Sequence, residues 1–292
     1  MKTRVLVITA AIVTVIGCGP REATPQAACD RACLASVLDA YLDALTRHDT
    51  SKLPTSSSVK FTENGRAMAL GDGLWKSAEA ITYRLDAIDP VGRQAATEAV
   101  VREHGELAHL LVRLKVDESQ KITEAETIVC RKGQQDLFGP ERLTTKPALY
   151  AEAVPASERS TRGQMAAMAD AYFTAIQTEG SADYRPAPLA ADMNRFENGI
   201  QTTNVAIFGM PAASASEQLE KGFFKGLTLA HRRVPVIDEE RGIALGIAVM
   251  QIQQSAPQGL LLAEMFKISG GQIRQIQAML LNHPNDGPTG WN

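Results

Sequence analysis

The stretch LASVLDAYLDAL at residues 34–45 occurs a second time, with changes, as MAAMADAYFTAI at residues 165–176. In both copies the apolar residues recur at intervals of three and four, which is the period of one face of an amphipathic helix. The tripeptide Asp-Ala-Tyr is unchanged between residues 39–41 and residues 170–172. Because the two copies are much farther apart than the units of a solenoid, the repeat predicts a duplicated domain.

Further matches extend the duplication beyond the helix. The tripeptide ENG at residues 63–65 recurs at 197–199, and LWK at 74–76 is echoed by FFK at 223–225. Compact apolar runs typical of strands then follow, at 95–102, 110–116 and 122–129 in the first copy and at 243–252, 261–267 and 273–280 in the second. Each copy is therefore predicted to be an α+β domain, in which a curved antiparallel sheet wraps around helices.

These repeats divide the 292 residues into six segments. We expect a signal segment at 1–17, a tether at 18–28, a first domain at 29–133, a proline-containing linker at 134–162, a second domain at 163–282 and an irregular tail at 283–292. Two domains suit a chain of this length. Since sheet faces in layered folds have to be covered, we expect the domains to pack through their sheets as an intrachain pseudo-dimer.

The N-terminal segment has the pattern of an export signal. Lys2 and Arg4 precede an uncharged, mostly apolar run at 5–17, which is shorter than the roughly 20 residues of a membrane-spanning helix. The run ends in VIGC at 15–18, which resembles the lipobox of bacterial lipoproteins and implies cleavage before Cys18 and lipidation of its thiol. Gly19 in the next position implies the outer membrane of a Gram-negative cell. We thus expect a lipid-anchored protein of the cell envelope facing the periplasm; the alternative is an ordinary signal peptide with a chance cysteine.

An exported protein occupies a compartment in which disulfides persist. Once Cys18 is lipidated, Cys29, Cys33 and Cys130 remain, and their odd number leaves at least one thiol unpaired or paired elsewhere. Cys29 and Cys33 are four residues apart, and Cys130 could pair with either of them. No histidine or second cysteine pair stands at ligand spacing, so we expect no metal site.

Several motifs carry a resemblance to a known family. They are CDRACL at 29–34, FTENG at 61–65, GLWK at 73–76, ENG at 197–199 with QTTN at 201–204, and PTGW at 288–291. The chain resembles the SnoaL-like group of the nuclear-transport-factor-2-like superfamily over nearly all of residues 29–292, and within it is similar to a bacterial and fungal domain of unknown function. The resemblance implies a cone-shaped sheet around a pocket. Many members of the superfamily use such pockets for cofactor-free isomerase, dehydratase or lyase chemistry, and others only bind or dimerise.

The composition and the missing motifs narrow the function. The net charge is −3, from 30 basic and 33 acidic residues, and no dense basic run is present, so we expect no nucleic-acid partner. The sequence has no GxSxG elbow, HExxH motif, P-loop or GxGxxG motif after a strand. We therefore expect no cofactor.

Strand alternation places Phe61 and Glu63 on one inward face, and Arg195 and Glu197 on the equivalent face of the second domain. An inward carboxylate is costly unless it is paired or neutral, and Arg195 is a partner within reach of Glu197. Glu63 has no such partner on its strand, so it is a candidate for a raised pKa and for acid–base work. The alternative is that both glutamates bind the backbone of the following turn, and their repetition favours this structural role.

Other candidate pocket residues stand at strand starts. Tyr83 and Arg84 align with Arg232 and Arg233, which follow His231. We take Tyr83, His231 and Arg232 as candidates, although a lone histidine is more often a surface residue.

Three classes of function stay open at this point. The first is a lipoprotein that binds a small apolar or aromatic molecule in a cone pocket. The second is a cofactor-independent acid–base lyase, isomerase or dehydratase, which a buried Glu63 or Glu197 beside a His or Tyr in an open pocket would favour. The third is a structural or interaction scaffold, which a filled core would favour.

Overall fold

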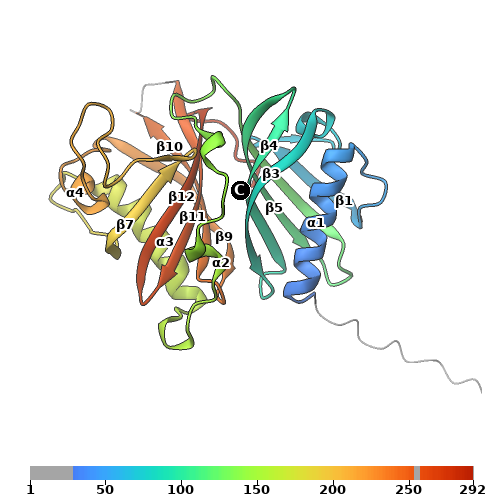
Figure 1. Ribbon diagram of the computed structural model, residues 1–292, viewed down its shortest axis with the longest axis horizontal. Helices are drawn as coiled ribbons and strands as arrows, with labels where there is room; N and C mark the ends of the chain where they lie inside the picture. The colour runs from blue at the N-terminus through green and yellow to red at the C-terminus, as the bar shows by residue number, and fades with distance from the viewer. Residues whose placement is uncertain (1–28, 253–256, 292) are drawn as a thin grey trace, which may run out of the picture.

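A computed structural model describes residues 29–252 and 257–291, which form two lobes whose sheets face each other (Figure 1). The expected signal segment, Cys18 and the tether lie outside these residues. Within the described ranges, no helix is both long enough and apolar enough to cross a membrane.

The first unit contains one long helix and one mixed sheet. Its elements are α1 (Arg31–Arg47), β1 (Thr55–Glu63), β2 (Arg66–Met68), η1 (Gly73–Lys76), β3 (Ala78–Asp89), β4 (Gln94–Glu103), β5 (Glu106–Val116) and β6 (Ile122–Cys130). The sheet order is β2-β1-β6-β5-β4-β3. Strands β3 to β6 form the predicted antiparallel meander, but β1 pairs with β6 in parallel. A parallel pair needs a long connection, and the intervening strands supply it.

The second unit repeats this order. Its elements are α3 (Arg162–Thr178), β7 (Leu189–Glu197), β8 (Ile200–Gln201), α4 (Ala215–Glu220), β9 (Leu227–Asp238), β10 (Ile243–Ile252), β11 (Gln258–Ser269) and β12 (Gln272–Pro284). The sheet order β8-β7-β12-β11-β10-β9 matches that of the first unit element by element, including the parallel pair β7 and β12. The predicted tandem α+β fold is confirmed.

The segment between the units forms only short helical elements among the described residues. It contains η2 (Pro140–Arg142), α2 (Ala148–Ala151) and η3 (Ala156–Glu158), and α3 starts at the last residue of the expected linker. At the other end, β12 extends two residues into the expected tail.

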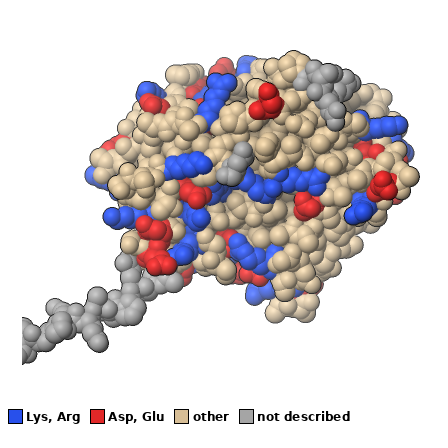
Figure 2. Space-filling model, turned by 180° about the vertical axis from the view of Figure 1, so that it is seen from behind, with Lys and Arg blue, Asp and Glu red and all other residues tan. Residues whose placement is uncertain are grey.

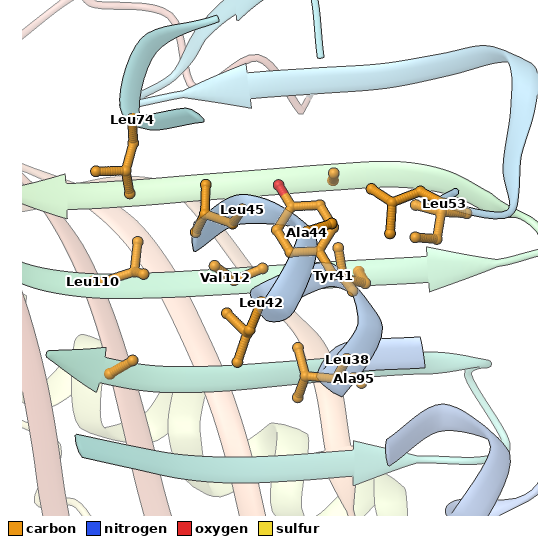
Figure 3. Packing of buried hydrophobic residues seen from close by; sticks show 14 of the residues in the cluster. Leu38, Tyr41, Leu42, Ala44, Leu45, Leu53, Leu74, Ala95, Leu110 and Val112 are labelled. Atoms are coloured by element: carbon orange, nitrogen blue, oxygen red, sulfur yellow. The ribbon is translucent and has the colours of Figure 1, made fainter. Parts of the chain in front are cut away.

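The helical stripe of residues 34–45 packs on the concave face of the first sheet, where its side chains point towards Leu110 and Val112 of β5 (Figure 3). Leu38 and Tyr41 have no exposed surface. Complete burial of a leucine-sized side chain contributes about 1.5–3 kcal/mol, so this stripe is the main reason why the helix docks on the sheet.

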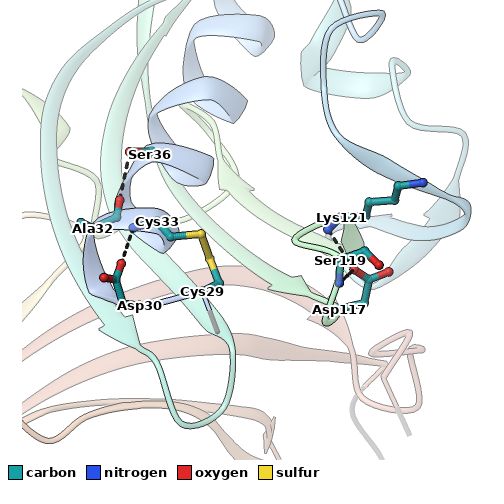
Figure 4. Close-up of a disulfide and its surroundings, with 8 residues drawn as sticks. All are labelled: Cys29, Asp30, Ala32, Cys33, Ser36, Asp117, Ser119 and Lys121. Atoms are coloured by element: carbon teal, nitrogen blue, oxygen red, sulfur yellow. Dashed lines mark hydrogen bonds between the residues drawn. A yellow bond between two sulfur atoms is a disulfide. The ribbon is translucent and has the colours of Figure 1, made fainter. Parts of the chain in front are cut away.

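The start of α1 is fixed twice. Asp30 caps the helix by accepting a hydrogen bond from the Cys33 backbone N–H at 2.9 Å, and Cys29 forms a disulfide with Cys33 (Figure 4). The Cα atoms of the two cysteines are 5.2 Å apart, within the range that a disulfide requires. Cys130 is a free, buried thiol. Of the pairings that the sequence left open, the structure therefore contains the one between Cys29 and Cys33.

The repeated Asn-Gly pair forms a tight hairpin turn in each unit. Asn64 and Asn198 both have positive φ, of 50° and 45°, as the two-residue turns that suit strand twist require. Each side chain then exchanges two hydrogen bonds with the last strand of its sheet: Asn64 with the backbone of Val129, and Asn198 with the backbone of Leu280. This part of the duplicated motif is structural.

The two sheets bury an apolar layer between them. Its members come from both units and from α2: Tyr83, Leu85, Ala87, Ala96, Val100, Leu111, Ile128, Cys130, Tyr150, Val236, Ile243, Leu245, Ile247, Val249, Leu261, Ala263, Met265, Met279 and Leu281. The intrachain pairing of domains therefore has a hydrophobic core of its own.

The rim of this interface is reciprocal. Asp238 accepts the backbone N–H of Ile88 at 3.0 Å, and Asp89 accepts that of Ile237 at the same distance. Arg31, which opens α1, pairs with Asp238, and Arg162, which opens α3, pairs with Asp89. Such exchange of equivalent contacts is the mark of a two-fold interface, here within one chain.

The segments that follow the last strands are also exchanged. Gly139 after the first unit donates its N–H to the carbonyl of Asn198 at 2.9 Å, and a Cβ at Gly199 would come within 2.3 Å of the Gly139 oxygen. Correspondingly, a Cβ at Gly65 would come within 2.0 Å of the Pro288 oxygen. Each Asn-Gly turn is thus closed by the chain of the other unit.

Acidic and basic side chains are interspersed over the face seen from behind in Figure 2. A further ion pair joins the two units, between Arg233 and the buried Glu126.

Candidate functional site

A cavity of about 210 Å³ lies in the cone of the second unit. Its walls come from the segment after β6, from α3 and β7, from the segments on either side of α4, and from β9 to β12: Gln135, Leu137, Tyr172, Ile176, Glu197, Phe208, Phe223, Phe224, Leu227, Met250, Ile252, Leu260, Glu264 and Leu280. Two carboxyl groups in a mostly apolar wall are the feature that sets this cavity apart, since carboxylates are rarely buried without a partner.

Arg195 lies at the centre of the polar groups. It is 1% exposed, and its Nε lies 2.7 Å from the Glu197 carboxylate. Its Nη1 donates to the Tyr172 hydroxyl at 3.0 Å and its Nη2 to Gln218 Oε1 at 2.7 Å. Burial lowers the pKa of Arg195, but Tyr172 and Glu197 more than offset this effect, so the net shift is upwards. The guanidinium is therefore a permanent, fully coordinated charge.

Glu264 is the second carboxyl group, and it has a different environment. It is 3% exposed, and its buried Oε2 has no hydrogen-bond partner among the described residues. Burial raises the pKa of Glu264 to about 8, against the opposing effect of Arg195. At neutral pH the group is mainly a neutral acid, which can donate a hydrogen bond into the cavity.

The sheet registers identify the residues of the first unit that occupy the same places. Glu63 pairs with Thr127, which pairs with Val112, whereas Glu197 pairs with Ala278, which pairs with Glu264. Val112 therefore replaces Glu264.

Two residues earlier on the same strands, Phe61 pairs with Ala125 of β6, and Arg195 pairs with Ile276 of β12. Phe61 therefore occupies in the first unit the position that Arg195 occupies in the second. Phe61 and Val112 both belong to the apolar core of their cone.

The aromatic segments before β3 and β9 complete the contrast. Trp75 is 1% exposed, stacks edge-on against Tyr41 with ring centroids 5.0 Å apart, and donates its Nε1–H to the Tyr41 hydroxyl at 3.3 Å. Phe224 in the second unit cannot donate; it lies under the Arg195 guanidinium, 4.9 Å from the ring centroid, and Arg195 bonds the tyrosine instead. Apolar and aromatic side chains fill these positions in the first cone, whereas the second cone contains a cavity and the buried Arg195–Glu197 ion pair.

Glu63 has a structural role. Its Oε2 accepts the backbone N–H of Leu74 at 2.7 Å, and its Oε1 lies 3.3 Å from Arg131. It holds the η1 turn in place, so Glu63 bonds a backbone N–H as in the structural alternative, but not that of the turn directly after its strand. Its ionic partner, Arg131, comes from the chain just after β6 and not from the strand of Glu63. Glu197 is paired with Arg195 as strand alternation predicted.

The other sequence candidates lie away from the cavity. Tyr83 is buried in the layer between the sheets, and its hydroxyl has no partner among the described residues. His231 is exposed in β9 with φ of 53°. Arg232 lies against α3, where it bonds Thr174 and Gln177 and pairs with Asp170. Burial raises the pKa of the Cys130 thiol to about 12, so this thiol is unreactive.

Sequence reasoning missed Glu264, Gln218 and Glu179. Glu179 follows α3, is 4% exposed, and has its pKa raised by burial to about 7, opposed by the Phe224 backbone N–H and by Arg195. Glu264 was detectable, because it stands between Leu262 and Phe266 on the inward face of its strand. Among the described residues, no three His, Cys, Asp or Glu side chains are grouped as a metal site requires.

Parts of the chain are similar to a protein-family model and to solved structures. Residues 158–280, which cover most of the second unit, match the model of a family described as a domain of unknown function (DUF8021). No curated protein matches the chain. Among solved structures, the chain is similar to a steroid delta-isomerase from Pseudomonas aeruginosa, with 18% identity, a TM-score of 0.28, and coverage of 34% of this chain and 80% of that chain.

Proposed function

We propose that the second unit binds a small, partly apolar molecule that carries a hydrogen-bond acceptor, and that the protein does so while anchored in the cell envelope by a lipid on Cys18. The observation that carries the binding proposal is Glu264, a buried acid whose Oε2 has no partner among the described residues and which lies in a mostly apolar cavity. A bound carbonyl or hydroxyl oxygen supplies the partner that the protein does not. Arg195 is not the recognition group, because Tyr172, Glu197 and Gln218 already occupy it.

Cyclohexanone and benzene are suitable probes, since they are six-membered rings of similar size and only cyclohexanone has an oxygen that accepts hydrogen bonds. Binding is followed by ligand-observed NMR with the parent, Glu264→Leu and the matched control Glu63→Gln. We expect Glu264→Leu to weaken cyclohexanone roughly tenfold, as loss of one buried hydrogen bond implies, and to leave benzene binding intact. The control should bind as the parent does. Failure of the parent to bind either probe would overturn the proposal.

A second candidate is a cofactor-independent acid–base enzyme, and one observation favours it: Glu197 and Glu264 line the same cavity in different environments. Paired acid and base roles need two groups in different environments, and here Glu197 is ion-paired with Arg195 whereas Glu264 has an Oε2 without a partner among the described residues. Exchange of the α-hydrogens of cyclohexanone for deuterium in D₂O tests this candidate. Exchange catalysed by the parent and by Glu63→Gln but lost in Glu264→Gln would establish proton transfer, and exchange by the parent no faster than in buffer without protein would leave binding alone.

The first unit supports a scaffold role for that half of the chain. The positions that correspond to the cavity site of the second unit are occupied in the first unit by Phe61, Val112 and Trp75, whose side chains are all 2% exposed or less. For the membrane anchor, Cys18→Ser should move the protein out of the membrane fraction, whereas an unchanged fractionation would refute the anchor.

A further inference from the structure

A second hollow lies directly outside the cavity. It has a volume of about 460 Å³ and is lined by Ile207, Met210, Pro211, Ala213, Gln218, Lys221, Gly222 and Phe223. Phe223 also lines the inner cavity, so this one side chain borders both spaces. Gln218 borders the outer hollow while its side chain bonds Arg195.

Exposed apolar side chains gather around this place. Five large hydrophobic residues are exposed among residues 29–252 and 257–291, and three of them border the two hollows: Phe208 at 59%, Met210 at 39% and Ile252 at 38%. Clustered exposure of this kind marks a binding surface, whereas scattered exposed side chains need no explanation.

The turn that contains Phe208 has a strained backbone conformation. Ile207 and Met210 bridge to each other, with Phe208 and Gly209 between them at φ of 54° and 74°. A bulky residue in the left-handed region is unusual, and such conformations persist where the surroundings enforce them, often at ligand sites. The turn holds an aromatic ring at the mouth of the inner cavity.

We infer that the two hollows form one site for an extended amphipathic molecule: an uncharged oxygen at its head meets Glu264 inside the cone, and an unbranched hydrocarbon tail lies in the outer hollow between the 207–213 segment and α4. This inference rests on the proposed function and names its ligand class. The inner cavity is smaller than the about 300–1,000 Å³ of typical ligand pockets, and together the two hollows fall within that range. Methionine side chains suit a flexible chain, because they adapt their shape.

A lipid-like chain suits the outer hollow because its walls are mostly apolar, with Lys221 and Gln218 as their polar members. A hydrocarbon tail gains affinity from each buried methylene, by about fourfold in Kd. An occupant confined to the inner cavity gains nothing from a longer tail.

Primary alcohols from butanol to decanol test this difference by isothermal titration calorimetry. We compare the parent with Met210→Ser in the outer hollow, and with Val91→Ser as a matched control, because Val91 is an apolar side chain exposed on the β3–β4 turn. In the parent and the control we expect Kd to fall about fourfold per methylene up to the longest alcohols. In Met210→Ser the short alcohols should bind as in the parent, and the gain should shrink for the long ones.

Two outcomes would overturn the inference, and they are distinct from failure of the proposed function. Affinity that stops rising at a short chain would confine the ligand to the inner cavity, and identical chain-length curves for Met210→Ser and the parent would place the tail elsewhere. Ile207→Ser provides a second variant if Met210→Ser does not fold. If no alcohol of any length binds, the proposed function itself fails.

Discussion

Replacement of Arg195 by alanine tests the buried network of the second cone. The guanidinium is 1% exposed, and its removal leaves the Glu197 carboxylate, the Tyr172 hydroxyl and Gln218 Oε1 without their donor. Breaking a buried ion pair from one side costs about 3–5 kcal/mol, because the remaining charge stays buried. For a chain of this size, the loss lowers Tm by roughly 10 °C.

The measurement is thermal unfolding followed by circular dichroism, with urea unfolding as a check. Arg274→Ala is the matched control, since Arg274 lies 3.6 Å from a largely exposed Asp192 and such surface pairs contribute about 0–1 kcal/mol. The double variant Arg195→Ala/Glu197→Gln should recover part of the loss, because it removes the orphaned charge. A Tm for Arg195→Ala equal to that of the parent, or additive losses in the double variant, would refute the account of this network.

Three other predictions concern pH, the interface and the tail. Because the pKa of Glu264 is raised to about 8 in the folded chain, the folded state holds a proton that the unfolded state releases above about pH 4.5, so stability falls by about 1.4 kcal/mol per pH unit between about pH 5.5 and 7.5. The difference in urea stability between the parent and Glu264→Gln should show this slope, and a difference that does not change with pH would contradict it. Asp89→Ala and Asp238→Ala should each lower the free energy of unfolding by at least about 2 kcal/mol, and by similar amounts, since each carboxylate binds an arginine and a buried backbone N–H of the other unit. Strongly unequal losses in urea unfolding would argue against a reciprocal interface. Trp291→Ala should cost about 1–2 kcal/mol, because the ring lies under Lys60 and Arg113 and donates to Thr62 at 2.9 Å; an unchanged midpoint would show that the tail contributes nothing.

Local periodicity made much of the fold predictable. The helical stripes, the Asn-Gly turns and the inward face of Arg195 and Glu197 all follow from spacing within one element. The alignment of Tyr83 and Arg84 with Arg232 and Arg233 is out of step, by one residue for Arg84 and by two for Tyr83, whose place in the second sheet is taken by Ala230. Arg84 pairs with Asp39 of α1 as Arg232 pairs with Asp170 of α3, so these two arginines are the equivalent pair.

Two β-bulges explain this slip. The register of β9 against β10 shifts between Leu245 and Ile247 and again between Ile247 and Val249, and His231 takes a left-handed conformation at the second shift. A bulge adds a residue to one strand and resets its alternation, and the sequence does not mark it with a glycine. The exposed position of His231 is a consequence of this insertion.

Contacts between the units were beyond sequence reasoning for a different reason. The Ile-Asp pair at residues 88–89 recurs at 237–238, and each helix begins with an arginine, yet the partner of each carboxylate belongs to the other copy. Which unit supplies a partner depends on how the sheets pack, and no period within a strand encodes that. Glu63 and Arg131 belong to one unit, but they too are far apart in the sequence and meet only because β6 returns beside β1.

The duplication gives the two cones different physical roles. A cavity with a buried ion pair and an unpartnered acid is less stable than one filled by apolar side chains, because desolvation of the polar groups is only partly recovered. In the first cone Phe61, Val112 and Trp75 fill the same positions with apolar or aromatic contacts. The apolar layer between the sheets, the reciprocal aspartates and the exchanged end segments connect this filled cone to the hollow one. The cost of Arg195 and Glu264 arises in one half of the chain, whereas the contacts between the units stabilise both halves, so the filled cone helps to offset the cost of the hollow one.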